Sequence, residues 1–111
     1  MVFVESKWFT RRLRELAREE ADDVLRAIQT DLVTLPARGK VVPGLGGIRK
    51  ARCANPRRGK GKRGGYRYLY LFLAQEDHIH LLFLLDKDEQ EDLTSGERAI
   101  LRRLVAEIGE G

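Results

Sequence analysis

Two apolar segments in the second half of the chain constrain its fold more than any other feature. They read YRYLYLFLA from Tyr66 to Ala74 and HIHLLFLL from His78 to Leu85, and only the residues QED separate them. Segments of this length with so short a connection are typical of a β-hairpin. Because both segments are apolar on both faces, the sequence predicts two central strands that are covered on both sides.

Helices that could cover this hairpin are predicted before and after it. Ser6 is expected to cap a first helix, and a second helix is expected to follow the acidic stretch AREEADD and to end at Pro36 and Gly39. The spacing of TSGE, from Thr94 to Glu97, matches a capping box and predicts the start of a last helix. The apolar stripes of the three helices are Phe9, Leu13 and Leu16; Val24, Ile28, Leu32 and Leu35 with Ala21 and Leu25 beside them; and Ile100, Leu101, Leu104, Val105 and Ile108.

Two further segments are predicted to be strands, the opening VFVE and Ile48–Ala54. Alternation within Ile48–Ala54 places Lys50 and Arg52 on one face and Arg49 on the other, whereas KVVPGLGG before it has the composition of a loop or an edge. The predicted order is therefore β-α-α-β-β-β-α, an α+β sheet with helices against it. A chain of 111 residues is expected to form a single domain, residues 1–111.

The charge of the chain is unevenly distributed. The 44 residues from Leu32 to Gln75 include no acid but 11 of the 21 basic residues, while the rest of the chain has 10 basic and 17 acidic residues. A solvated surface normally mixes its signs, so an unrelieved basic segment indicates an anionic partner. Nucleic acid is the favoured partner. An acidic protein is a weaker alternative, and a membrane surface is disfavoured because the basic segment contains no amphipathic helix.

Several features bear on location and cofactors. Cys53 is the only cysteine and cannot form an internal disulfide, so the cytoplasm is expected, and the N-terminal residues do not resemble a signal peptide. GLGGIR lacks the strand and helix of a dinucleotide site, and GKGKRGG lacks the Ser or Thr of a P-loop. His78 and His80 share a strand face without an evident third ligand. We therefore expect no cofactor and no metal.

The remaining chemistry is that of clustered cations. Lys50 and Arg52 are neighbours on one strand face, and Arg67 opens the strand that follows the basic hairpin. Such residues can bind phosphate without reading bases, and they can stabilise the extra charge of a phosphorane. Because the 2′-hydroxyl of RNA is a built-in nucleophile, a cluster of this kind could cleave RNA without a metal. The alternative is that it only grips a nucleic-acid backbone.

Three stretches, GLGGIRKAR, GKGKRGGYRYLYLF and LLFLLDKDEQEDLTSGE, closely resemble the HigB branch of the RelE superfamily of type II toxins, over nearly the whole chain. The resemblance implies a small twisted antiparallel sheet with two N-terminal helices and a C-terminal helix. It also implies an mRNA interferase that cuts the message in the ribosomal A site, with a cognate helix-turn-helix antitoxin as partner. It places catalysis on Lys50, Arg52 and Arg67, with Lys87 and Glu89 of the tail motif nearby, and we add Tyr70 to the catalytic candidates as a possible proton donor. The RNA-binding residues expected beside them are Arg49, Arg57, Arg58, Lys60, Lys62 and Arg63.

The sequence departs from this family at one place. Relatives commonly have an aromatic and then a small residue before the tail lysine, whereas Leu85 and Asp86 precede Lys87 here. A tyrosine of the preceding strand (Tyr66, Tyr68 or Tyr70) could replace the missing ring. The alternative function is that of a non-enzymatic relative that binds another target such as DNA gyrase, or of a plain RNA-binding module.

Overall fold

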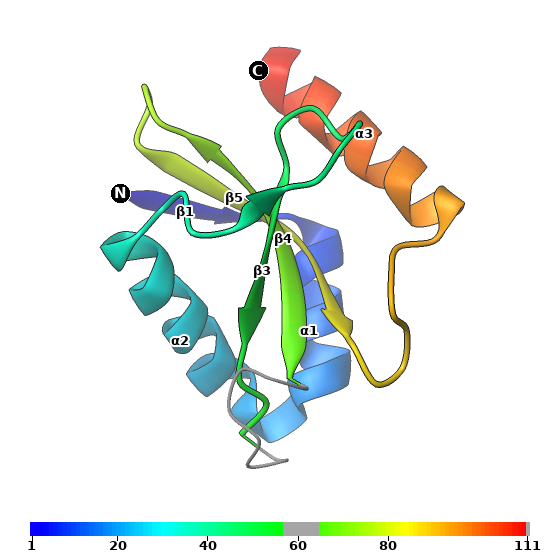
Figure 1. Cartoon of the computed structure of the whole chain (residues 1–111). Coiled ribbons are helices and arrows are strands. Elements are labelled where there is room, and N and C mark those ends of the chain that lie inside the picture. Colours follow the sequence, from blue (N-terminus) through cyan, green and yellow to red (C-terminus); the bar gives the residue numbers. More distant parts are fainter. Residues whose placement is uncertain (57–64, 111) are drawn as a thin grey trace.

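The computed structural model describes residues 1–56 and 65–110, and they form the α+β fold that the sequence predicted. Two helices lie in the chain between the first strand and the other strands, and a third helix follows the last strand (Figure 1). A single 3-10 turn, Arg18–Glu20, separates the first two helices at the acidic stretch. The elements are β1 (Val2–Glu5), α1 (Lys7–Ala17), α2 (Ala21–Thr34), β2 (Lys40–Val41), β3 (Arg49–Cys53), β4 (Tyr66–Leu73), β5 (His78–Asp86) and α3 (Ser95–Glu110).

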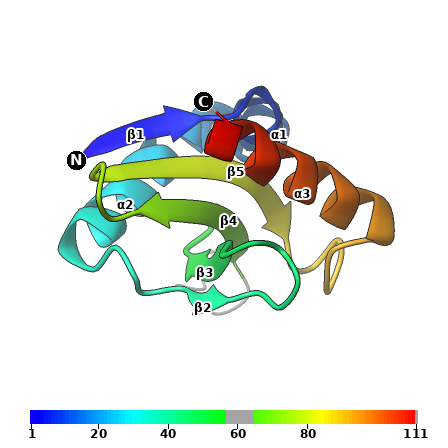
Figure 2. The same ribbon diagram turned by 90° about the horizontal axis from the view of Figure 1, so that it is seen from above.

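The strands form one sheet in the order β1-β5-β4-β3-β2 (Figure 2). The pairs β3–β4 and β4–β5 are antiparallel, as expected, and the pair β2–β3 is antiparallel as well. Two details differ from the prediction. The segment read as a loop or an edge contributes the short edge strand β2, and β1 runs parallel to β5. Two strands joined by a tight turn must run antiparallel. Because β1 and β5 are connected through most of the chain, they can also run parallel.

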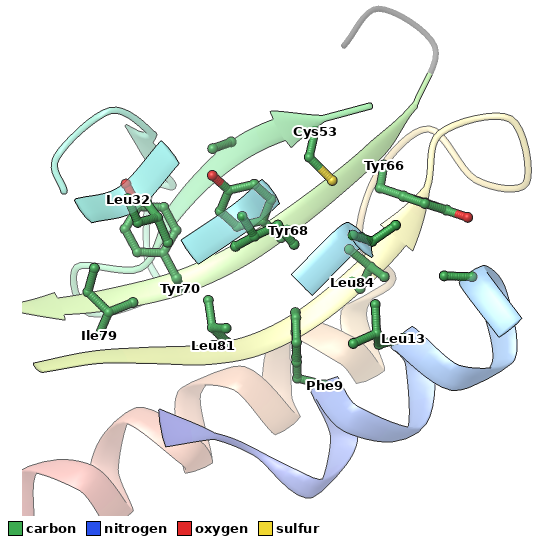
Figure 3. Packing of buried hydrophobic residues seen from close by; sticks show 14 residues of the cluster. Phe9, Leu13, Leu32, Cys53, Tyr66, Tyr68, Tyr70, Ile79, Leu81 and Leu84 are labelled. Carbon is green, nitrogen blue, oxygen red and sulfur yellow. The ribbon is translucent and has the colours of Figure 1, made fainter. Parts of the chain in front are cut away.

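The central strands β4 and β5 are covered on both faces, which confirms the prediction from their composition. One face packs against α1 and α2 and forms the first core, in which Tyr68 and Tyr70 of β4 are buried together with Phe9, Leu13 and Leu32 of the two helices (Figure 3). The other face packs against α3 and forms the second core. Its buried residues are Val42, Leu45, Ile48, Leu69, Leu71, Leu82, Phe83, Leu85, Leu93 and Leu101.

The predicted helix caps are present. The Ser6 hydroxyl accepts a hydrogen bond from the Phe9 amide at 2.9 Å. At the start of α3 the Thr94 hydroxyl accepts from the Glu97 amide at 3.1 Å, and the Glu97 carboxylate accepts from the Thr94 amide at 2.9 Å. These two bonds are the reciprocal pair of a capping box. Both helices therefore begin where the sequence indicated.

Two residues of the predicted apolar stripes are exposed. Leu35 is 56 % exposed, because α2 ends at Thr34 and the chain turns away before the stripe is complete. Ile100 is 38 % exposed at the margin of the α3 contact. Cys53 is buried in the first core and forms no disulfide among the described residues. None of the helices in the described residues has the length and apolarity required to cross a bilayer.

Candidate functional site

A cavity of about 550 Å³ brings together four of the five basic residues that the sequence singled out and the structure describes. Lys50 and Arg52 reach it from β3, Arg67 from β4, and Lys87 from the segment after β5. Of the described residues that line this cavity, six are basic and one, Glu91, is acidic. The full lining is Arg38, Lys40, Lys50, Ala51, Arg52, Arg67, Lys87 and Glu91.

Strand register explains why these cations meet. Arg52 lies directly opposite Arg67 in the β3–β4 pair, and Lys40 lies directly opposite Lys50 in the β2–β3 pair. Side chains of opposite residues share a face with their Cβ atoms about 4.5–5.5 Å apart, and like charges placed so are destabilising. Two such pairs side by side therefore lower the stability of the protein alone, and an anionic ligand would relieve the repulsion.

Arg67 is the most unusual residue of the cavity. It is only 9 % exposed, and its Nη1 atom has no hydrogen-bond partner among the described residues. Burial, and next the charge of Arg52, lower the pKa of Arg67 from its ordinary value. A buried cation with an unsatisfied donor costs free energy. A phosphate group can offset that cost, because its oxygens accept the two parallel hydrogen bonds that a guanidinium offers.

The structure does not place Tyr70 in this cavity, contrary to its expected catalytic role. The side chain is fully buried in the first core, on the opposite face of the sheet (Figure 3). Its hydroxyl donates to the Pro36 carbonyl at 2.8 Å and accepts from the Gly39 amide at 2.9 Å, and burial raises the pKa of Tyr70. Tyr66 and Tyr68 are buried in the same core. None of the three tyrosines therefore supplies the missing ring.

Arg49 is also on the first-core face, as strand alternation requires. Its Nη1 donates to the Gly39 carbonyl at 2.7 Å and to the Ala37 carbonyl at 3.3 Å. Arg49 thus joins Tyr70 in holding residues 36–39, which we call the 36–39 loop. A side chain at Gly39 would come within 2.9 Å of the Lys50 carbonyl and 3.0 Å of the Tyr70 ring, so only glycine fits there. Arg49, expected to bind RNA, is engaged in holding this loop.

Two cavity residues were not predicted from the sequence. Arg38 lies within the 36–39 loop, and Lys40 directly follows it. Arg38 is held by an ion pair with Asp31 of α2 at 3.2 Å. Both residues belong to the acid-free segment and contribute to the excess of positive charge that the sequence showed there. Their position beside Lys50 depends on the pairing of β2 with β3, which no local pattern indicated.

The segment after β5 presents Lys87 and Glu91 to the cavity, whereas Glu89 is exposed and is not part of the lining. Asp86 shapes this segment. It is 4 % exposed, its carboxylate accepts from the Asp88 amide at 3.0 Å, and its carbonyl accepts from the Glu89 amide at 3.0 Å. Asp86, one of the two positions at which the sequence departs from the family, therefore forms a turn that directs Lys87 to the cavity. Leu85 is buried in the second core, so no ring reaches the cavity from that position either.

The two histidines considered as metal ligands are not part of the cavity lining. Within the described parts of the chain, no group of three or more His, Cys, Asp and Glu residues could hold a metal ion. His78 and His80 have ring centroids 6.3 Å apart at the end of β5 remote from Asp86, and burial lowers the pKa of His80. Five predicted RNA-binding residues lie outside the described residues. These are Arg57, Arg58, Lys60, Lys62 and Arg63.

Comparison with known proteins agrees with this architecture. Residues 1–110 match the family model described as the RelE toxin of the RelE / RelB toxin-antitoxin system. The structure is similar to the isolated Escherichia coli RelE toxin, with a TM-score of 0.56 and 10 % identity over 93 % of this chain and 97 % of that one. It is also similar to a chain of the Mycobacterium tuberculosis toxin–antitoxin complex RelBE2, with a TM-score of 0.60 and 24 % identity over 77 % of this chain and 95 % of that one. At these identities the structural similarity shows the shared fold.

Proposed function

The chain belongs to the RelE toxin family of toxin–antitoxin systems, and on that premise we propose that it is a metal-independent endoribonuclease that cuts messenger RNA on the ribosome. The observation that most supports this proposal is the buried guanidinium of Arg67, which lies opposite Arg52 inside a basic cavity and has no partner at Nη1 among the described residues. An RNA phosphate is the anion that would satisfy it. The cavity is lined by charge and offers no aromatic surface among its described residues, so it fits a backbone better than a base.

Cleavage would proceed by attack of the 2′-oxygen on the adjacent phosphorus. The new bond joins the 2′-oxygen to phosphorus, and the bond to the 5′-oxygen of the next nucleotide breaks. The products are a 2′,3′-cyclic phosphate and a 5′-hydroxyl. Arg52 and Arg67 would bind the non-bridging oxygens, whose negative charge grows as the fifth bond forms. Donors already positioned for that charge lower the barrier without reorganisation.

Two proton transfers complete the reaction. Glu91 would accept the proton of the 2′-hydroxyl, since it is the acid on the cavity wall among the described residues. Lys87 would donate a proton to the departing 5′-oxygen, and water would restore both groups. Lys50, two residues from Arg52 on β3, would hold the RNA backbone next to the reacting phosphate. The substrate supplies the nucleophile and the side chains supply the charge and the protons, so each step is complete without a metal ion.

The partners follow from the same proposal. The solved complexes similar to this chain are toxin–antitoxin complexes from Escherichia coli and Mycobacterium tuberculosis. We propose that a cognate antitoxin with a helix-turn-helix domain binds this chain. We also propose that the toxin acts in the cytoplasm, on the ribosome and the message. The segment with Lys60, Lys62 and Arg63, which lies outside the described residues, would contact ribosomal RNA.

The test is inducible expression without antitoxin, followed by mapping of message ends with and without kinase treatment. The proposal predicts growth arrest, cuts inside translated frames, and new 5′ ends that can be ligated only after phosphorylation. Arg67→Ala should leave messages intact. New ends that already carry a 5′-phosphate would contradict attack by the 2′-oxygen. Growth arrest with uncut messages would favour the binding-only alternative, which a DNA-supercoiling assay would then examine.

A further inference from the structure

The basic cavity contains more positive charge than one phosphate requires. We propose that it binds two consecutive phosphates of single-stranded RNA, and that Lys40 and Lys50 form the subsite for the second one. This inference rests on the proposed function and adds a second subsite to it. We call Arg52 and Arg67 the first basic pair and Lys40 and Lys50 the second basic pair. All four residues line the same cavity.

The spacing of the two pairs supports two phosphates. Lys50 and Arg52 are two residues apart on β3, so their side chains leave the same face at points about 6.6 Å apart. This distance is comparable with the separation of neighbouring phosphates along an extended nucleic-acid strand. Each residue has a like-charged partner directly opposite, Lys40 for Lys50 and Arg67 for Arg52. The cations therefore repeat along β3 at the interval of a nucleic-acid backbone.

The position of the second basic pair is fixed by buried contacts from the other face of the sheet. Tyr70 and Arg49 bind the backbone of the 36–39 loop directly before Lys40, at distances of 2.7–2.9 Å from Gly39. On the far side of β2, the Val42 amide donates to the Ile48 carbonyl at 2.8 Å. Lys40 is exposed but is anchored on both sides of its backbone. A preorganised donor of this kind loses less entropy on binding than a lysine on a free loop.

The chemistry of the second basic pair predicts which feature of the RNA it recognises. A lysine ammonium acts as a point charge and does not read a base edge. The second subsite should therefore recognise a charged phosphate in any sequence, and its contribution should appear in ground-state binding. Loss of such binding raises KM with little change in kcat, whereas loss of the first basic pair lowers kcat.

The experiment uses ribosomes programmed with three synthetic messages. One is unmodified, and the others have an uncharged methylphosphonate linkage one position 5′ or one position 3′ of the cut. For the unchanged protein, we expect one of the two neutral linkages to raise KM about tenfold. Lys40→Ala should raise KM on the unmodified message by a similar factor and should lose its sensitivity to that linkage. An unchanged KM on both modified messages, or a Lys40→Ala protein as sensitive as the unchanged one, would overturn the second subsite.

Controls separate this inference from the proposed function. Lys7→Ala removes the same charge from an exposed position on α1 and should behave as the unchanged protein. Lys40→Arg should restore sensitivity to the neutral linkage, which also excludes misfolding as the cause of the Lys40→Ala effect. Failure to cut the unmodified message would overturn the proposed function and the subsite together. Normal cutting with no response to either neutral linkage would overturn the subsite alone.

Discussion

Arg67 is a residue that we propose to act in cleavage and expect to lower the stability of the folded protein. Its guanidinium is buried, has no described partner at Nη1, and lies opposite Arg52. A protein selected only for stability would have an apolar side chain there, because a buried unpaired charge is unfavourable. Arg67→Met keeps the unbranched shape and removes the charge. We expect it to raise the free energy of unfolding by about 1 kcal/mol while abolishing cleavage.

Urea unfolding of the purified protein measures this effect, with the midpoint of Arg67→Met higher than that of the unchanged protein at a similar slope. Arg103→Ala, which removes an exposed arginine of α3, should leave the midpoint nearly unchanged. A lower midpoint for Arg67→Met would mean that contacts of the guanidinium stabilise the folded protein.

The shape of the Arg67 side chain should matter as well as its charge. Arg67→Lys keeps a cation in the cavity but loses the planar pair of donors that fits two phosphate oxygens. Loss of one preorganised donor typically lowers a rate by about 10²–10³. We expect Arg67→Lys and Arg67→Ala both to relieve growth arrest and to retain antitoxin binding. Full toxicity of Arg67→Ala in a strain without antitoxin would show that Arg67 is not catalytic.

Glu89 and Glu91 are two candidate proton acceptors two residues apart, and only Glu91 lies on the described cavity wall. Glu91→Gln keeps the shape and removes the basic oxygen, so it should lower kcat about 10²-fold or more without a comparable change in KM. Glu89→Gln serves as the matched comparison and should have a smaller effect. The opposite ranking in a ribosome cleavage assay would assign the proton transfer to Glu89.

At the scale of elements, the 36–39 loop connects the first core to the cavity. The Tyr70 hydroxyl satisfies both the Pro36 carbonyl and the Gly39 amide from beneath the sheet. Tyr70→Phe keeps the ring and leaves these buried groups without a partner, at a cost of about 1–3 kcal/mol. It should also displace Lys40, so we expect KM to rise while kcat is largely retained.

Tyr66→Phe is the control for this prediction. Its hydroxyl donates to the Leu16 carbonyl at 3.2 Å, at a site unconnected to the loop. This variant should lower the free energy of unfolding without changing KM. A large fall in kcat for Tyr70→Phe with normal KM would instead support the catalytic role first expected for Tyr70.

At the scale of the whole molecule, we expect charge to govern how tightly the protein binds its target. Each phosphate contact releases counterions, so ribosome binding should weaken steeply with salt. Changing Lys60, Lys62 and Arg63 together to alanine should flatten the slope of log K against log salt by up to about three. Binding measured across a salt series gives this slope. An identical slope for the triple variant would place the electrostatic contacts on another surface.

Much of the fold could be predicted because its determinants are local. The apolar composition of Tyr66–Leu73 and His78–Asp86 indicated central strands, and both proved to be covered on two faces. Ser6 and the Thr94–Glu97 capping box marked helix starts through bonds between residues close in sequence. Such patterns act over three or four residues, so they can be read without knowing the partner elements.

The candidate site could be predicted only in part. Alternation along β3 correctly put Lys50 and Arg52 on one face, and it also put Arg49 on the other, which was in conflict with an RNA-binding role. The choice of Tyr70 did not use this rule and depended on the search for a ring to replace the one missing before Lys87. Its hydroxyl is directed to the 36–39 loop, because the face of β4 that contains Tyr70 is the one that packs on α1 and α2.

The sequence by itself determined the classes of element, their caps and the unbalanced positive charge, since each depends on neighbours along the chain. Only the tertiary structure decided which charges meet. Strand register set Arg67 opposite Arg52 and brought Lys40 beside Lys50, and the turn at Asp86 directed Lys87 to the cavity. Register is a relation between distant segments, and a shift by one residue would send each side chain to the opposite face. The cationic cavity is therefore a product of strand pairing, and no single stretch of the sequence specifies it.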